Sequence, residues 1–330
     1  MQILSPSARR IRRLLLAALL LVVILPVAAC FDPLDRAGSR DPNPNHIVVG
    51  SGTFPESQII GQIYIDALRA NGFKVSDRLN SGTRERYIPA LRAGDIDLVP
   101  DYVGNLLQYL AKSAKGIDAQ RADALQSLTV LPAIEAALPQ VLGADLVTYS
   151  PAPGSNSDSV TVSRETADRH HLVTIDDLAR LSQTQTVTFM ANSEFATRPV
   201  GLPGLLENYG LKVDFRPNND SGGPATQKAL LSGNVTAADI YTTTPLLLQT
   251  DKVAVLDDPR GNFPANNVVP VLAREKNSPR LRTVLDAVSA KLTLQQLQSL
   301  NDMVSGSRKI EIEDAAKDWV RAQGLNRRIG

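Results

Sequence analysis

Residues 47–110 alternate apolar strand-like runs with amphipathic helical segments, and this alternation restricts the chain to an α/β fold. The first run ends at Gly50-Ser51-Gly52, and Thr53 and Glu56 then have the spacing of a capping box at a helix start. The predicted elements are a strand at 47–49, a helix from 53 to 70, a strand at 75–79, a helix at 87–93 and a strand at 96–99. This β-α-β-α-β order predicts a mostly parallel sheet flanked by helices, with ligands at the carboxyl ends of its strands.

The second half of the chain repeats the first. Strands are predicted at 187–190, 213–215 and 235–240, and helices at 202–209, 225–231 and from 245. At a constant offset of 139 positions, Ala90, Leu91, Gly94, Ile96 and Tyr102 match Ala229, Leu230, Gly233, Val235 and Tyr241. If the two units face each other, Tyr102 and Tyr241 lie in one cleft on opposite walls. The alternative is that two α/β units share an A-L-x-x-G turn by chance.

The C-terminal stretch contains no third unit of this kind. Helices are predicted at 280–292, from Thr293 to 303 and at 314–323, and Trp319 in the last of them has the spacing of a core residue. We expect these helices to return and pack on the first unit. Two crossovers, near residues 150 and 262, then join the lobes as in hinged binding proteins.

The N-terminus has the features of an export signal. Four arginines precede an apolar stretch, Leu14 to Leu25, that is shorter than the roughly 20 residues a membrane-spanning helix needs. Val27-Ala28-Ala29-Cys30 follows and resembles a bacterial lipobox, in which the cysteine is lipidated. Cys30 is the only cysteine of the chain. The alternative is a chance cysteine beside a cleavage site.

These features predict a signal peptide at 1–29 and a lipidated Cys30 that anchors the exported protein to the outer face of the cell membrane. Residues 30–45, rich in Asp, Pro, Asn and Arg, are predicted to be a flexible tether. Removal of residues 1–29 takes four arginines from 35 basic residues and leaves 34 acidic ones, so the mature net charge is −3. Nothing in this charge predicts nucleic acid as a partner.

The sequence carries no recognisable catalytic signature, and it predicts no metal and no cofactor. It has three histidines, and the adjacent pair His170-His171 lacks the spacing of a shared metal face. Acid pairs such as Asp95 with Asp97 border strands or turns, where carboxylates are usually solvated. We therefore expect a binding protein rather than an enzyme, and keep an exported enzyme on the same fold as the alternative from another class.

Three segments carry a family resemblance: G-S-x-x-F-P-E-S-Q at 50–58, the long block at 81–104 and R-P-V-G-L-P-G-L at 198–205. Together with a weaker match at 257–264, they resemble the substrate-binding lipoproteins of ABC importers for quaternary-ammonium osmoprotectants such as glycine betaine, choline and carnitine. The resemblance covers nearly all of residues 46–325.

The resemblance implies a two-lobed type II periplasmic-binding-protein fold that closes on its ligand like a hinged clamp. It also implies a small-molecule ligand, an ABC permease as partner and a monomeric protein. Combined with the crossovers, it places lobe 1 at 46–151 plus 262–330 and lobe 2 at 152–261.

In that family, tyrosines surround the trimethylammonium group, because a methylated cation offers no N–H donors and is attracted to aromatic faces. The resemblance assigns this role to Tyr102 and Tyr241, and it assigns Arg198 to a ligand carboxylate. The expected ligand-binding set is Tyr102, Tyr241, Arg198, Asp158, Asn266, Asn105, Gly52, Phe54 and Asn156.

Three positions depart from the family pattern: Asp158 and Asn266 stand where tyrosines are usual, and Gly52 stands where a lysine is usual. Phe54 or Phe195 can complete the aromatic box, although a phenylalanine in such a position is more often a core residue. Asp158 and Arg198 can also simply pair with each other. The incomplete box leaves a different small polar or aromatic solute as an alternative ligand.

Overall fold

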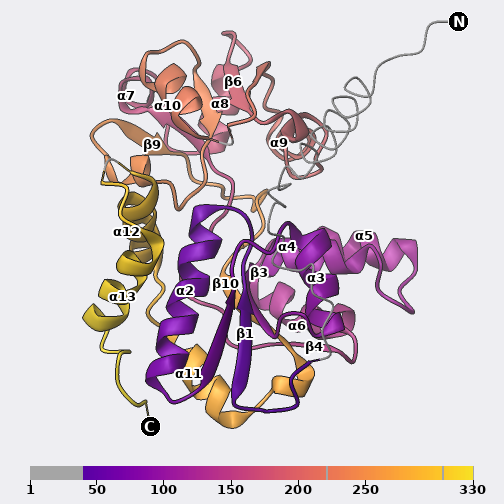
Figure 1. Cartoon of the computed structure of the whole chain (residues 1–330). Helices are drawn as coiled ribbons and strands as arrows, with labels where there is room; N and C mark the ends of the chain where they lie inside the picture. The colour runs from indigo at the N-terminus through magenta and orange to yellow at the C-terminus, as the bar shows by residue number, and fades with distance from the viewer. Residues whose placement is uncertain (1–39, 221, 307, 330) are drawn as a thin grey trace, which may run out of the picture.

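A computed structural model describes residues 40–220, 222–306 and 308–329. The chain forms two lobes, each built on a five-stranded sheet (Figure 1). The first sheet has the order β2-β1-β3-β10-β4, in which β1 is parallel to β2 and β3, and β10 is antiparallel to β3 and β4. Its strands are β1 (His46–Gly50), β2 (Lys74–Arg78), β3 (Leu98–Tyr102), β4 (Leu146–Thr148) and β10 (Val268–Ala273).

The second sheet has the equivalent order β7-β6-β8-β5-β9, with β6 parallel to β7 and β8, and β5 antiparallel to β8 and β9. Each sheet is therefore mostly parallel with one reversed strand, and β6, β7 and β8 occupy the places of β1, β2 and β3. This shared order agrees with the internal repeat in the sequence. The strands are β5 (Val160–Ser163), β6 (Thr188–Ala191), β7 (Asp214–Pro217), β8 (Ala237–Asp239) and β9 (Val253–Val255).

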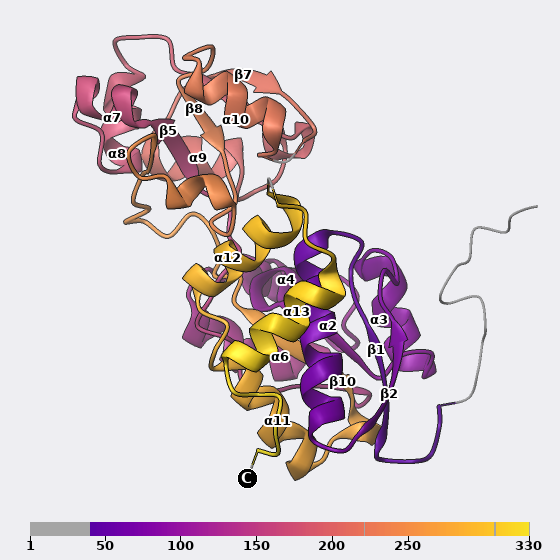
Figure 2. The same cartoon turned by 60° about the vertical axis from the view of Figure 1, so that its left-hand side comes forward.

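Helices cover both faces of the first sheet. One apolar core lies between the sheet, α2 and the C-terminal helices, and a second core lies between the opposite face and α3 to α6. Figure 2 shows α12 and α13 alongside α2, so the C-terminal helices return to the first lobe as predicted, and Trp319 is buried there. The helices are α2 (Pro55–Ala70), α3 (Arg84–Ala93), α4 (Val103–Ala111), α5 (Ala119–Gln126), α6 (Leu131–Leu142), η3 (Arg274–Lys276), α11 (Pro279–Ser289), α12 (Leu294–Ser305) and α13 (Ile312–Ala322).

The second lobe has shorter helices around its own apolar clusters. They are α7 (Arg164–His170), α8 (Ile175–Leu181), η1 (Ser193–Ala196), α9 (Leu202–Tyr209), α10 (Pro224–Leu231) and η2 (Pro245–Leu248). The helix predicted to begin at 245 is thus a single 3₁₀ turn, and the strand predicted at 235–240 is confined to β8.

Two predictions near the start of the chain are wrong in detail. Thr53 and Glu56 do not form a capping box, since α2 begins after Phe54 and no side chain caps it. Glu56 is instead turned into the protein, where it binds groups far away in the sequence. The third strand lies at Leu98–Tyr102 rather than 96–99, which makes Tyr102 its last residue.

The two segments that join the lobes lie side by side. Ser155 and Asn267 form an isolated antiparallel bridge, and the main-chain amide of Asn156 donates to the main-chain oxygen of Asn266 at 2.9 Å. Paired crossing segments of this kind are where a hinge motion between lobes is absorbed. The lobe boundaries at 151–152 and 261–262 stay a prediction.

The first residues that the structure describes are fixed on the first lobe. Lys276 is buried and donates to the main-chain oxygen of Asp41 at 2.6 Å, and Arg40 pairs with Asp97 at 3.1 Å. The end of the predicted tether, residues 40–45, is therefore held by the lobe rather than free of it. The predicted signal peptide 1–29, Cys30 and the rest of the tether lie outside the described residues.

Candidate functional site: a cavity between the lobes

A cavity of about 830 Å³ is lined by residues of both lobes. Its first-lobe wall comes from the start of α2, the end of β3 and α12, and its second-lobe wall comes from the loops after β6, β7 and β8. The carboxyl ends of parallel strands therefore point into it, as expected for an α/β ligand site. The lining residues used below are Phe54, Glu56, Arg84, Tyr102, Asn105, Asn156, Asp158, Arg198, Asp220, Tyr241, Asn266 and Asn301.

Three of the described lining residues are aromatic: Phe54, Tyr102 and Tyr241. The Phe54 and Tyr102 rings lie 6.0 Å apart at an interplanar angle of 30°. Tyr241 is half-buried and comes from the second lobe, just after β8. The structure therefore brings the two repeat-related tyrosines to one cavity from different lobes.

The phenol of Tyr102 is held by a buried carboxylate. Its hydroxyl donates to Oε1 of Glu56 at 2.6 Å. Burial raises the pKa of Tyr102 well above its ordinary value, and the neighbouring charge of Glu56 raises it further. The hydroxyl consequently stays protonated and remains a donor.

Glu56 connects several elements at this wall. The same Oε1 accepts a hydrogen bond from Asn156 at 2.8 Å, and Oε2 accepts one from Asn301 at 2.5 Å. Asn301 lies on α12 and also donates to the main-chain oxygen of Thr243 in the second lobe, at 3.0 Å. Sequence reasoning missed this role, because the capping-box spacing offered Glu56 a local use.

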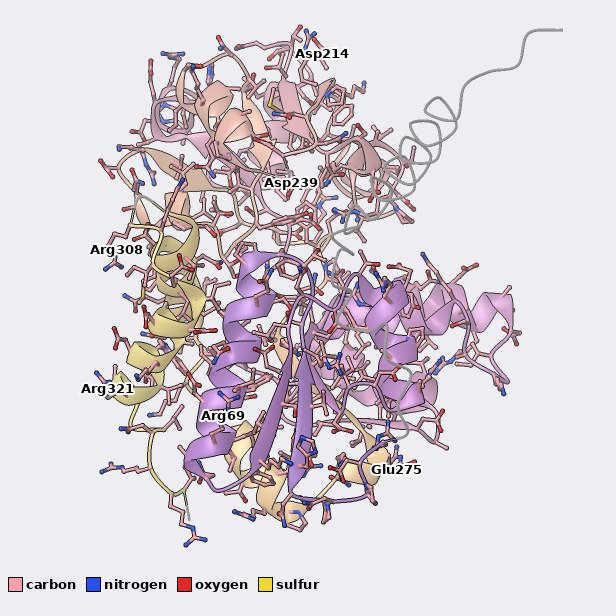
Figure 3. All side chains as sticks on the ribbon, viewed as in Figure 1. Arg69, Asp214, Asp239, Glu275, Arg308 and Arg321 are labelled. Carbon is pink, nitrogen blue, oxygen red and sulfur yellow. The ribbon has the colours of Figure 1, made fainter. Side chains whose placement is uncertain are left out.

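A partly buried ion pair occupies the second-lobe wall. Nη2 of Arg198 lies 2.7 Å from Oδ1 of Asp158, and the guanidinium lies over the ring of Phe195. Fully buried Asp239, labelled in Figure 3, lies at the end of β8 and interacts electrostatically with both members of this pair. Burial raises the pKa of Asp239 well above its ordinary value, and the charge of Asp158 raises it further, so the structure favours the protonated acid.

Arg84 forms a second ion pair at the opposite wall. Its Nη2 and Nε lie 2.5 and 3.0 Å from the two carboxylate oxygens of Asp101, which is a bidentate arrangement. Tyr87 also donates to Asp101. No sequence argument had selected Arg84, although the long motif at 81–104 contains it.

The asparagines of the predicted set line the cavity through different contacts. Oδ1 of Asn266 accepts from the main-chain amide of Asn105 at 2.9 Å, so it binds an otherwise open amide in the first turn of α4. Asn156, in the first crossover, contributes its side chain to Glu56. A polar network thus occupies the place where the family pattern has a tyrosine at 266.

Packing decides between the two phenylalanines. Phe54 is 42% exposed and lines the cavity, whereas Phe195 is fully buried and its ring lies 5.5 Å from that of Phe189. Phe195 therefore belongs to the second-lobe core. Gly52 is not among the lining residues; its amide donates to Oγ of Ser57, and a Cβ there would meet the Phe54 ring at 3.0 Å.

Comparison with known proteins identifies the family of this chain. The model for the substrate-binding domain of ABC-type glycine betaine transport systems matches residues 45–322. The chain belongs to this family. Members are extracytoplasmic binding proteins of ABC importers, and they are transport proteins rather than enzymes.

The curated relatives share about a quarter of their aligned residues with this chain. The glycine betaine-binding protein YehZ of Escherichia coli is 25% identical over 84% of this chain and 90% of its own length. A glycine-betaine-binding protein of Pseudomonas aeruginosa is 27% identical over 84% and 88%. An ergothioneine transport permease/ergothioneine-binding protein of Helicobacter pylori is 26% identical over 84% of this chain, which spans 48% of that longer protein.

Solved structures confirm the two-lobed periplasmic-binding fold. Apo YehZ superposes with a TM-score of 0.63, covering 84% of this chain and 99% of that one at 24% identity. A glycine betaine/carnitine/choline ABC transporter protein gives 0.68, covering 85% and 99% at 23% identity. Within the part of this chain that the structure describes, no helix has the length and apolarity needed to span a membrane.

Proposed function

We propose that this protein captures a small quaternary amine of the glycine betaine or choline type in the inter-lobe cavity and delivers it to an ABC permease. The observation that carries the proposal is the convergence of Phe54, Tyr102 and Tyr241 on one cavity from two lobes. A trimethylammonium group has no N–H to donate, so aromatic faces are the protein groups best suited to hold it. Family membership supports the same class of ligand.

The proposed binding set keeps the residues expected from the sequence and adds Glu56. Tyr102, Tyr241 and Phe54 supply aromatic surface, and Glu56 supplies negative charge near the Tyr102 hydroxyl. The remaining members of the proposed set are Arg198, Asp158, Asn105, Asn156 and Asn266, with Gly52 outside the lining but next to the Phe54 ring, which an added Cβ would meet at 3.0 Å.

Calorimetry tests the proposal with choline, glycine betaine and 3,3-dimethylbutan-1-ol, an uncharged analogue of choline with the same shape. We expect binding of at least one of the two charged ligands and little or none of the neutral analogue. Tyr102→Ala and Tyr241→Ala should each weaken binding by about 2- to 30-fold, since one cation–π face contributes about 0.5–2 kcal/mol. Tyr109→Ala, on α4 and outside the cavity lining, is the matched control. Unchanged affinity in both cavity variants contradicts the proposal.

We further propose that the mature protein is a monomer, begins at a lipidated Cys30 and works at the outer face of the cell membrane. The lipobox-like sequence before Cys30 and the apolar stretch ahead of it support this. Mass spectrometry of protein purified from its own cells is the test. A mature N-terminus other than Cys30, or a Cys30 without diacylglycerol, contradicts it.

A further inference from the structure

We infer that Asp158 and Asp239 share a proton beside Arg198, so that a ligand carboxylate binds at the second-lobe wall together with a proton taken from solvent. A cation without a carboxylate binds without this uptake. This rests on the proposed function, because it concerns how the same cavity accepts the anionic end of a ligand. Glycine betaine and choline are the two probes, since both carry a trimethylammonium group and only glycine betaine carries a carboxylate.

Arg198 is the cation of the cavity that can best accept a further partner. Among the described residues that line the cavity, the cationic side chains are Arg84 and Arg198. Arg84 already binds both carboxylate oxygens of Asp101. Arg198 binds Asp158 through Nη2 at 2.7 Å, its side chain is 32% exposed, and its Nε has no hydrogen-bond partner among the described residues. Because a guanidinium offers five N–H donors in a fork that fits carboxylates, a ligand carboxylate gains most at Arg198.

Two buried acids depend on this one arginine. Asp158 and Asp239 are both buried, and both interact electrostatically with Arg198. Asp220 also lines the cavity, but its carboxylate accepts hydrogen bonds from two main-chain amides at the start of α10, at 2.7 and 3.0 Å. Two ionised carboxylates that share one cation in a buried setting repel each other, so one of them favours the protonated form.

The contacts of Asp239 show how the excess charge is relieved. Its side chain forms a hydrogen bond with that of Asp158, and two ionised carboxylates cannot do this, because neither has a hydrogen to donate. Oδ1 of Asp239 has no hydrogen-bond partner among the described residues, and an unpartnered buried oxygen is less costly in a neutral acid than in a carboxylate. Burial raises the pKa of Asp239, and the charge of Asp158 raises it further, in agreement with one shared proton.

A ligand carboxylate brings a third negative charge to the same arginine. Whether it displaces Asp158 from Arg198 or binds beside it, Asp158 loses part of its counter-charge and the acid pair holds its proton more firmly. The apparent pKa of the pair is therefore higher with the ligand than without it, and protons are taken up at pH values between the two. Over that range the affinity for glycine betaine falls as the pH rises, by at most about tenfold per pH unit for one proton.

The other charged or titratable groups near the pair can be separated from it. Those that line the cavity are Arg84, Tyr102, Tyr241, Asp220 and Glu56. Of the elements packed against β8, α10 carries Lys228, whereas β5 and β6 carry no charged residue. Asp239→Asn leaves all of these groups in place and removes only the group that titrates with Asp158. A change in proton uptake in this variant therefore reports on the pair.

Calorimetry in two buffers with different protonation enthalpies gives the number of protons taken up with each ligand. The proteins are wild type, Asp239→Asn and Asp176→Asn, measured from about pH 5 to pH 9, where glycine betaine has a constant charge because α-carboxyl groups ionise at about 3.3–3.7. We expect wild type to take up protons with glycine betaine and not with choline. Its affinity for glycine betaine should fall about threefold or more over this range, which corresponds to a pKa rise of about half a unit.

In Asp239→Asn the proton uptake with glycine betaine should disappear, and its pH dependence with it. The amide can still donate to Asp158 but cannot titrate. Asp176→Asn removes the acid that is paired with Arg260, outside the cavity lining in the same lobe, and should behave as wild type.

Several outcomes overturn the inference while the proposed function stands. They are binding of glycine betaine without proton uptake, equal uptake in wild type and Asp239→Asn, equal uptake with both ligands, and binding of choline without any binding of glycine betaine. If wild type binds neither ligand, the proposed function itself fails. If Asp239→Asn does not fold, wild type decides: uptake with glycine betaine alone supports the inference, and any other result rejects it. If choline does not bind, the comparison of wild type with Asp239→Asn decides.

Discussion

Replacing Asp158 by Asn should destabilise the protein and shift its ligand preference toward zwitterions. The change removes one charge of the Asp158–Arg198 pair while keeping a side-chain oxygen of similar shape. Breaking a fully buried pair costs about 3–5 kcal/mol, and an exposed pair contributes about 0–1 kcal/mol. The Asp158 side chain is 6% exposed, but that of Arg198 is 32% exposed, so solvent screens part of the effect. We therefore expect a loss of about 1–2 kcal/mol in the free energy of unfolding.

Asp239 should reduce this loss in the free energy of unfolding. The charge of Asp158 is the second cause of its raised pKa, after burial. Removing this charge lowers the pKa of Asp239 and makes its carboxylate a more available partner for Arg198. The loss should consequently stay well below that of a pair without a second acid. Asp158→Asn combined with Asp239→Asn should lose more than the sum of the two single variants.

The same substitution should improve binding of glycine betaine. Arg198 becomes available to a ligand carboxylate, and hydrogen bonds to charged groups contribute about 1.5–3 kcal/mol each. Part of this gain is lost because Arg198 is partly solvated, so we expect about a tenfold shift in the betaine-to-choline ratio.

Urea unfolding followed by far-UV circular dichroism measures the stability of both lobes, since the only tryptophan, Trp319, is buried in the first lobe and reports on that lobe. Calorimetry measures the two ligands. Asp176→Asn removes the partner of the more exposed Arg260 in the same lobe and is the matched control. Unchanged stability together with an unchanged ligand ratio would refute the reasoning, because the pair would then be neither a stabilising contact nor a barrier to carboxylates.

Three further predictions concern Asp239, Gly52 and the closure of the lobes. Burial raises the pKa of Asp239 in the folded state above its unfolded-state pKa of about 3.9. Asp239 therefore lowers the free energy of unfolding increasingly as the pH rises from the unfolded-state pKa toward the folded-state pKa. The free energy of unfolding of wild type minus that of Asp239→Asn should fall over this pH range, and a difference independent of pH would contradict the prediction. Gly52→Lys should not restore the family's cation to the cavity, because Gly52 is buried and is not among the residues that line the cavity; a gain in glycine betaine affinity would count against this geometry. Small-angle scattering should give a smaller radius of gyration with saturating ligand than without, as hinge closure requires, and an identical profile with a ligand known to bind would exclude closure.

Much of the fold could be predicted because its elements are encoded locally. The alternation of apolar runs with helical spacing and the repeat at 139 positions predict two α/β units, and both sheets have the equivalent strand order. What local patterns could not supply is the reversed strand in each sheet. β10 lies beside β3, and β5 lies beside β8, through pairings between distant segments.

The site was predictable where the repeat and the family motifs coincide, at Tyr102 and Tyr241, both of which line the cavity. It was not predictable where two uses of one residue compete. Glu56 has local capping spacing, but its partner Tyr102 lies 46 positions away. Phe54 and Phe195 were equivalent candidates in the sequence for completing the aromatic box, and their different exposures result from tertiary packing that no short pattern records.

The aspartate and arginine side chains behind the two cavity walls are paired differently. Each lobe places a buried aspartate near the end of its central strand, Asp101 in β3 and Asp239 in β8, with an arginine close by. In the first lobe that aspartate holds the arginine through two oxygens. In the second lobe Arg198 is bound by Asp158 instead, and Asp239 is left with one oxygen unpartnered among the described residues. Asp158 and Asp239 thus share one arginine, and Asp220 adds a further acid to this wall. A single substitution there changes the charge that a ligand meets, whereas the first-lobe pair is already matched. Changes in ligand class should therefore arise at Asp158 and Arg198, which line the cavity, with Asp239 acting through them.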